Sequence, residues 1–210
     1  MPRLLRILTV GAALSTGYVL ARQQALRLGA TQVERSIGLP GDELLPDADL
    51  VATRAITVPA PASAVFPWLL QLGQGRGGFY SYDALENLLG LDIHSADRIV
   101  PEWQDLAVGD SVRLGERVEL RVARQEPDRA LVLQGDAPAL PDEETAPFDF
   151  VWSFVLRPGQ LPGTTRLVVR ERYGYREPWA RYPVAAMTWA STLMTAGMLR
   201  GIRDRAARAR

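Results

Sequence analysis

His94 is the only histidine of the chain, and an imidazole titrates near neutral pH, so its type suits proton transfer. Asp92 and Asp97 lie close to it in the sequence and could assist it as a general base. A structural hydrogen bond to loop backbone is the alternative. The chain has no cysteine, and one histidine supplies fewer ligands than a stable transition-metal site normally has. We therefore expect no metal site.

Glu171 is a carboxylate on the apolar side of an expected strand. Within residues 164–175 it shares its parity with Leu167, Val169 and Tyr173, whereas the arginines take the other parity. If the apolar side points inward, burial would raise the pKa of the carboxyl group. Glu171 is then a polar ligand contact or a proton donor, and a bulge that returns it to water is the alternative.

A glycine-rich loop spans residues 73–78, with the sequence GQGRGG. It follows an expected helix rather than a strand, which argues against a dinucleotide-binding loop, and we expect no cofactor. Arg76 and the backbone N–H groups of Gly77 and Gly78 suit an anion. A salt bridge from Arg76 to an acid of the neighbouring helix is the alternative.

Several large apolar side chains have the shape needed to line a hydrophobic pocket, because rings stack on flat ligands and methionine adapts to different shapes. Plain core packing is the alternative for all of them. The predicted ligand-binding residues are Tyr80, Tyr82, His94, Trp103, Phe150, Trp152, Phe154, Glu171, Met187 and Met194. No catalytic residue is assigned. If the protein is an enzyme, His94, Glu171 and Tyr82 would carry the chemistry.

The elements that must position these residues follow from hydrophobic periodicity. Residues 50–58 form a strand, and two short helices follow, one after Pro61 and one after Ser81. Period-two alternation then predicts strands near residues 118–122, 148–156 and 164–175. A long helix runs from Pro183 to about residue 207. Its stripe, expected to face the sheet, is Val184, Met187, Ser191, Met194, Met198 and Ile202.

The first residues differ from the rest of the chain. Fifteen uncharged residues, 7–21, stand between arginines. They predict an N-terminal apolar helix within residues 1–28 that anchors the chain at a membrane; a cleaved signal peptide, hence secretion, and a soluble amphipathic helix are the alternatives. Residues 29–49, rich in Gly, Pro and acids, are predicted as a linker. Residues 50–208 form the folded domain.

The charge balance argues against nucleic-acid binding. The chain has 24 Arg and 24 Asp or Glu, with no Lys, so basic residues are not in excess. Residues 51–150 hold 8 Arg against 16 acids, and residues 151–210 hold 11 Arg against 3. The two parts are expected to attract each other within one fold. The hydrophobic fraction of 47% is that of a folded domain and excludes a disordered chain.

The order of elements resembles the helix-grip fold of the START-domain and pollen-allergen superfamily, also called SRPBCC or polyketide cyclase-like. The resemblance is tightest in RAITVPAPASAVFPWLLQL, residues 54–72. Residues 73–90 and 92–110 resemble a bacterial membrane-associated branch of this superfamily. The likeness covers residues 50–208. It implies an α+β fold in which a curved antiparallel sheet wraps around the long C-terminal helix.

The resemblance and the residues together suggest a function. We expect binding or carriage of a hydrophobic small molecule or lipid in a cavity between sheet and C-terminal helix, near a membrane. An aromatase/cyclase-type enzyme acting on a polyketide-like substrate is one alternative, and a scaffold with a filled cavity is another. Since no catalytic triad or carboxylate pair is visible, binding is preferred to catalysis.

Overall fold

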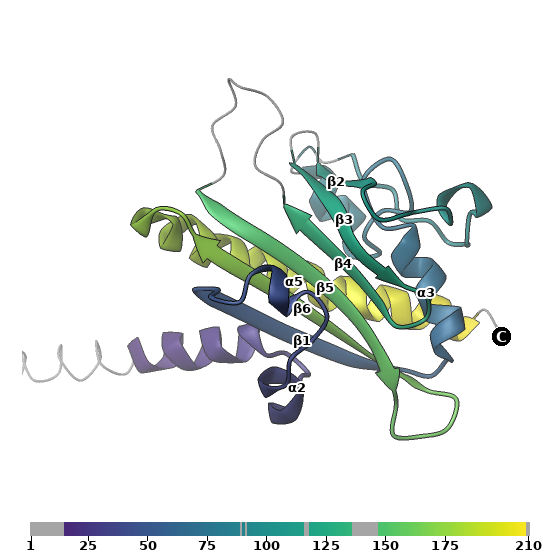
Figure 1. Ribbon diagram of the computed structural model, residues 1–210, viewed down its shortest axis with the longest axis horizontal. Helices are drawn as coiled ribbons and strands as arrows, with labels where there is room; N and C mark the ends of the chain where they lie inside the picture. The colour runs from purple at the N-terminus through teal and green to yellow at the C-terminus, as the bar shows by residue number, and fades with distance from the viewer. Residues whose placement is uncertain (1–14, 89, 91, 116–117, 136–146, 209–210) are drawn as a thin grey trace, which may run out of the picture.

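A single curved antiparallel sheet forms the framework of the computed structural model, which describes residues 15–88, 90, 92–115, 118–135 and 147–208 (Figure 1). The strand order is β1-β6-β5-β4-β3-β2, and each neighbouring pair is antiparallel. The strands are β1 (Leu50–Val58), β2 (Ser111–Gly115), β3 (Val118–Glu126), β4 (Ala130–Gly135), β5 (Phe148–Pro158) and β6 (Thr165–Tyr175). The long strands β5 and β6 pair along their whole length at the centre of this arrangement.

Helices cover the concave face of the sheet. The long helix α5 (Arg181–Arg208) lies behind the sheet in Figure 1, next to α3 (Ala62–Leu70). The smaller elements on the way are α4 (Asp83–Leu88) and the 3₁₀ turns η2 (Pro101–Trp103) and η3 (Pro178–Ala180). An antiparallel sheet closed by a long C-terminal helix is the helix-grip arrangement, so the expected α+β class is confirmed for the described residues.

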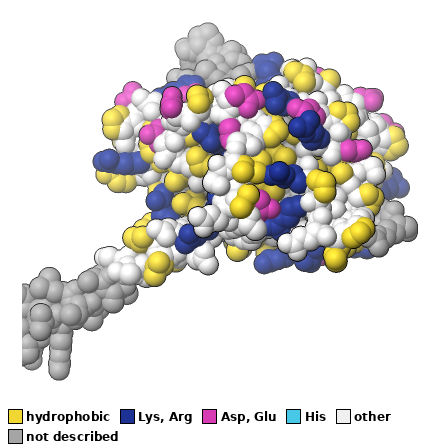
Figure 2. Space-filling view, turned by 60° about the horizontal axis from the view of Figure 1, so that its bottom comes forward, with side chains coloured by type: hydrophobic (Ala, Val, Ile, Leu, Met, Phe, Trp, Pro, Cys, Tyr) yellow, Lys and Arg dark blue, Asp and Glu magenta, His cyan; other side chains and the backbone are white. Residues whose placement is uncertain are grey.

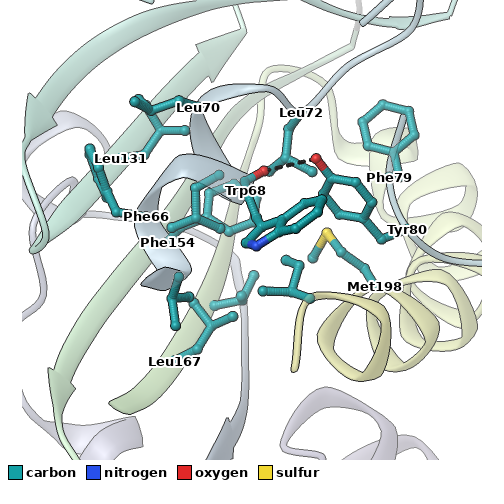
Figure 3. Close-up of a cluster of buried hydrophobic side chains, with 14 of the residues drawn as sticks. Phe66, Trp68, Leu70, Leu72, Phe79, Tyr80, Leu131, Phe154, Leu167 and Met198 are labelled. Atoms are coloured by element: carbon teal, nitrogen blue, oxygen red, sulfur yellow. Dashed lines mark hydrogen bonds between the residues drawn. The ribbon is translucent and has the colours of Figure 1, made fainter. Parts of the chain in front are cut away.

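The main core lies between α3, the sheet and the second half of α5 (Figure 3). Trp68 and Tyr80 pack edge to face with ring centroids 5.5 Å apart, and the Tyr80 hydroxyl donates to the Trp68 carbonyl. Phe154 and Met198 are almost fully buried in the same cluster. The space that the sequence predicts as a cavity is therefore filled by side chains at this end of α5.

The inward face of α5 differs from the predicted stripe. Val184, Met198 and Ile202 are buried as expected, but Met187 is 44% exposed. Thr188 and Thr195 are buried in its place. The first half of the helix thus turns hydroxyl groups to the sheet, and the reason lies in the charged groups opposite them.

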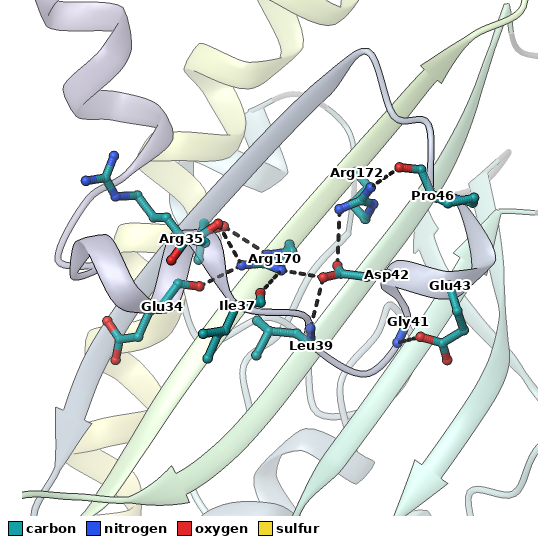
Figure 4. A network of polar contacts seen from close by, with 12 residues as sticks. Glu34, Arg35, Ile37, Leu39, Gly41, Asp42, Glu43, Pro46, Arg170 and Arg172 are labelled. Carbon is teal, nitrogen blue, oxygen red and sulfur yellow. Dashed lines mark hydrogen bonds and ion pairs between the residues drawn. The ribbon is translucent and has the colours of Figure 1, made fainter.

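The segment predicted as a linker packs on the outer face of the sheet. It contains α2 (Gln32–Ser36) and the 3₁₀ turn η1 (Asp42–Leu44), which lie in front of the strands in Figure 1. Arg170 and Arg172 of β6 hold it (Figure 4): Arg170 donates to the Glu34 carbonyl at 2.6 Å and pairs with Asp42 at 2.5 Å. Arg172 donates to the Pro46 carbonyl at 2.8 Å. Residues 29–49, here called the strap, thus have the composition of a linker but are bonded to the sheet by arginines of β6.

Glu34 is the acidic end of a second ion pair in this strap. Its carboxylate lies 2.7 Å from Arg166 of β6, and it also accepts the Thr31 backbone N–H in a capping box. The hydrogen bond from Arg166 lowers the pKa of Glu34 to about 2, against the opposing effect of burial.

Residues 15–26 are helical and reach the domain at their C-terminal end. The remainder of the predicted anchor, residues 1–14, lies outside the described residues. None of the helices in the described parts of the chain is both long and apolar enough to span a bilayer.

Candidate functional site

A buried ion pair lies between the sheet and the first half of α5. Arg54 projects from β1 and Glu171 from β6, and their side chains are 0% and 2% exposed. Arg54 Nη1 donates to Glu171 Oε1 at 2.8 Å. Burial of two charges is costly unless their remaining polar atoms are bonded, so the surroundings of this pair decide whether it is tolerated.

Hydroxyl groups complete the shell around Glu171. Ser191 and Thr195 of α5 donate to Oε1 at 2.5 and 3.2 Å, and Tyr173 donates to Oε2 at 3.2 Å. Burial, followed by the negative charge of Glu171, raises the pKa of the Tyr173 phenol, which therefore stays protonated and remains a donor. This shell explains why the first half of α5 turns serine and threonine inward.

Arg54 links the same cluster to the N-terminal helix. Its Nε donates to the carbonyl oxygen of Ala25 at 3.0 Å, and its Nη2 donates to Thr192 Oγ1 at 2.8 Å. Four parts of the chain, β1, β6, α5 and residues 15–26, thus meet at one guanidinium group.

A row of aromatic rings continues from this cluster along β5. Trp152 is the cross-strand partner of Glu171, and Phe150 is the partner of Tyr173, so these side chains share the concave face. The Phe150 and Tyr173 rings are 4.8 Å apart, and the Phe148 and Tyr173 rings are 5.8 Å apart. Phe148 and Phe150 are only half-buried. The row therefore runs from a partly open end to a buried polar end.

The indole N–H of Trp152 is buried and has no hydrogen-bond partner. Buried donors in proteins are almost always bonded. The indole N–H of Trp68 in the core is unpaired as well, so the position of Trp152 is distinguished by the half-buried Phe150 ring beside it. Trp152 lies between Phe150 and Phe154, with ring centroids 6.5 and 4.6 Å away. The unpaired N–H group thus lies within a row of aromatic rings.

The structure brings some of the predicted site residues together. Phe150, Trp152 and Glu171 lie on one face of adjacent strands, and Phe154 continues the row into the core. Met194 is half-buried on α5. Tyr80 lies in the core cluster rather than in the open end of the row.

Other predicted residues lie apart from this face. The side chain of His94 is 80% exposed and contacts Asp92 at 3.1 Å. Tyr82 is exposed beside Arg200, and Met187 is exposed on α5. No contact among the described residues joins His94, Tyr82 and Glu171, so the three candidate catalytic groups are not assembled. Within the same residues, no group of three or more acids and histidines forms a metal site.

The predicted anion loop uses one guanidinium nitrogen of Arg76 and two backbone N–H groups within the protein, whereas Arg76 Nε is buried without a partner. Arg76 donates to the carbonyl oxygens of Leu70 and Trp103 at 3.0 and 2.8 Å, and burial lowers its pKa. The N–H groups of Gly77 and Gly78 donate to the carbonyls of Gln71 and Gly73. Trp103, predicted as a ligand contact, is half-buried at this junction. The loop thus joins α3 to η2.

Sequence reasoning missed Arg54, Tyr173, Ser191 and Thr195 as site residues. A signal for Arg54 existed, because it shares its parity in the first strand with Ala52, Ile56 and Val58, as Glu171 does in β6. Two opposite charges on the apolar parities of two strands indicate a buried pair. The hydroxyl groups of α5 are the donors that such a pair needs.

The comparisons with known proteins concern the fold. No protein-family model matches the chain, and no curated protein matches its sequence. Protein MLL2253 from Mesorhizobium loti is a similar solved structure, 16% identical over 75% of this chain and 98% of that one, with a TM-score of 0.43. CalU16 from Micromonospora echinospora is 15% identical over 75% and 84%, with a TM-score of 0.33. DynU16, a putative protein in the dynemicin biosynthetic locus, is 16% identical over 72% and 46%, with a TM-score of 0.39.

Proposed function

We propose that this protein binds an amphipathic small molecule, a lipid or a similar hydrophobic compound, on the concave face of β5 and β6 beneath α5. The orphaned indole N–H of Trp152, together with the half-buried Phe150 ring beside it, carries the proposal. A carbonyl, ether or hydroxyl oxygen of the ligand would accept this hydrogen bond and remove the cost of an unpaired buried donor.

The neighbours of Trp152 set the chemistry of the ligand. The rings of Phe148 and Phe150 offer an apolar surface that is only half-buried, so a hydrophobic body can reach it from outside. Arg54 and Glu171 already neutralise each other, so a ligand with a net charge would enter without a counter-ion. An uncharged molecule with one polar end fits this arrangement best.

The test is equilibrium binding of Nile red, an uncharged dye with a carbonyl acceptor, to the full chain without lipid. Trp152→Phe keeps the ring and removes the N–H, so the Kd should rise by about 5- to 10-fold, the value of one hydrogen bond. The matched control is Trp189→Phe, which removes an exposed indole on the outside of α5. It should leave the Kd unchanged.

Two results would overturn the proposal. One is the absence of saturable binding to the wild-type chain. The other is an equal effect of both substitutions, or no effect of Trp152→Phe, because the dye would then bind elsewhere.

A non-catalytic scaffold is the second candidate, and one observation favours it. Phe154, Met198 and Trp68 fill the apolar end of the space between sheet and helix, where a ligand-carrying protein would be hollow. Native mass spectrometry of gently purified protein separates the two functions: a copurified small molecule supports ligand binding, and protein that is repeatedly empty supports the scaffold.

A further inference from the structure

The first half of α5 has polar side chains facing the sheet and apolar side chains facing outward, the reverse of a helix on a water-exposed surface. Its sheet-facing side carries Ser191 and Thr195, which donate to Glu171 of the buried ion pair, and the buried Thr188. Its outward side carries large apolar groups, with Trp189 39% and Leu193 48% exposed. A helix on a water-exposed surface normally has the polar residues outside.

The exposed groups form one continuous stripe. Tyr182, Ala186, Trp189 and Leu193 follow each other at spacings of 4, 3 and 4, which places them on one side of a helix. Met187 lies beside the stripe and is also exposed. No charged residue occurs from Tyr182 to Leu199. From Tyr182 onward, the outward side of this half therefore carries no charged group that would favour water over an apolar neighbour.

The start of the described chain extends the same surface. Tyr18 of the N-terminal helix packs on Trp189, with ring centroids 6.1 Å apart. Val19 and Leu20 beside it are at least half exposed. Figure 2 shows apolar side chains on the part of the chain that extends from the compact body.

Charge identifies the partner surface. Arg181 begins α5 and stacks on the ring of Tyr182 at 4.9 Å, and Arg200 follows the uncharged stretch. No Asp or Glu occurs between Glu177 and Asp204. Aromatic rings with a polar edge, flanked by arginines and free of acids, suit the headgroup region of a bilayer that contains anionic lipids.

We infer that Tyr18, Tyr182, Met187, Trp189 and Leu193, here called the interfacial surface, dock on an anionic bilayer. This inference does not depend on the proposed ligand, because the interfacial surface and the ion-pair cluster lie on opposite sides of α5. It accounts for both sides of this half of the helix. The inward hydroxyl groups face the polar ion pair of the protein, and the outward apolar groups face the membrane.

The test uses the full chain and vesicles of phosphatidylcholine and phosphatidylglycerol whose acyl chains carry bromine, which quenches nearby tryptophans. Quenching of the wild-type fluorescence should fall by about half in Trp189→Phe, because an interfacial indole is removed. Trp103→Phe, which removes a half-buried indole of η2, is the matched control and should leave it unchanged.

Three results would overturn the inference. The first is equal quenching of wild type and Trp189→Phe, which would leave attachment to other residues. The second is equal binding to vesicles of phosphatidylcholine alone, which would exclude the anionic contribution. The third is a dimer in the absence of lipid that Leu193→Arg dissociates, because a second copy of the chain would then cover the surface.

Discussion

The two halves of α5 bury opposite kinds of side chain, although they form one continuous helix. From Met198 onward the helix buries Met198, Leu199 and Ile202 against α3 and the sheet. Arg200 and Arg208 are exposed on its other side. Before that point it buries hydroxyl groups and exposes a tryptophan and a leucine. The difference lies in what faces them: an apolar core in one case, and the Arg54–Glu171 pair in the other.

The comparison teaches that a buried charge pair dictates the sequence of the element that covers it. A carboxylate with several lone pairs needs donors, and Ser191 and Thr195 provide them from adjacent turns. With serine and threonine at the positions that face the ion pair, apolar side chains on the inner side of the helix would add little stability. Its hydrophobic residues are then free to serve a second surface.

The largest expected effect on the packing of the first half of α5 comes from removing one charge of the Arg54–Glu171 pair. Arg54→Met leaves Glu171 buried without its partner, so the free energy of unfolding should fall by about 3–5 kcal/mol. Urea denaturation of the full chain measures it. The double variant Arg54→Met/Glu171→Leu should regain at least about half of this loss, because a buried pair is often replaceable by apolar groups. A loss below about 1 kcal/mol in the single variant would contradict the central role of the pair.

Two leucines of the same helix compare the halves directly. Leu199 is 3% exposed and Leu193 is 48% exposed. Leu199→Ala should lower the free energy of unfolding by about 2–4 kcal/mol, since it leaves a cavity in the core. Leu193→Ala should change it by less than about 0.5 kcal/mol. Equal losses in urea denaturation would mean that the outward side of the first half is buried in solution.

The Glu34–Arg166 pair of the outer face sharpens the contrast, because its side chains are 12% and 19% exposed, against 2% and 0% for Glu171 and Arg54. The pKa of Glu34 is lowered to about 2, below its value in the unfolded chain, so its contribution is complete above about pH 4.5 and disappears as the pH falls toward 2. Screening by solvent limits this contribution to about 1 kcal/mol. Between pH 5 and 2.5 the wild type should lose that much more stability than Glu34→Gln. Parallel pH profiles of the two chains would contradict it.

Strands β1, β3, β5 and β6 could be predicted from the sequence because the alternation of apolar and polar residues is local, whereas the short β2 was not predicted. The parity of Glu171 in residues 164–175 placed its carboxylate on the apolar side, where the structure has it. The long helix and the two short helices also follow from local periodicity and caps. These features depend on neighbours within a few residues, which a single sequence shows.

The features that escaped prediction depend on distant residues. The strap 29–49 has the composition of a linker, but its acids and carbonyl groups bond to arginines of β6, and Leu39 packs on Val155 and Val168 of the sheet. Met187 was predicted inside because an apolar stripe was assumed to face the sheet. The arginine on β1 that reverses this preference lies more than a hundred residues earlier in the chain.

The bonds from Arg54 to Ala25 and from the Ala55 N–H to the Leu28 carbonyl leave no slack between the N-terminal helix and the domain. If residues 7–21 enter a bilayer, the domain would not reorient independently of the N-terminal helix. The bonds to the carbonyls of Ala25 and Leu28 would then restrict the distance of the domain from the bilayer and its orientation relative to it.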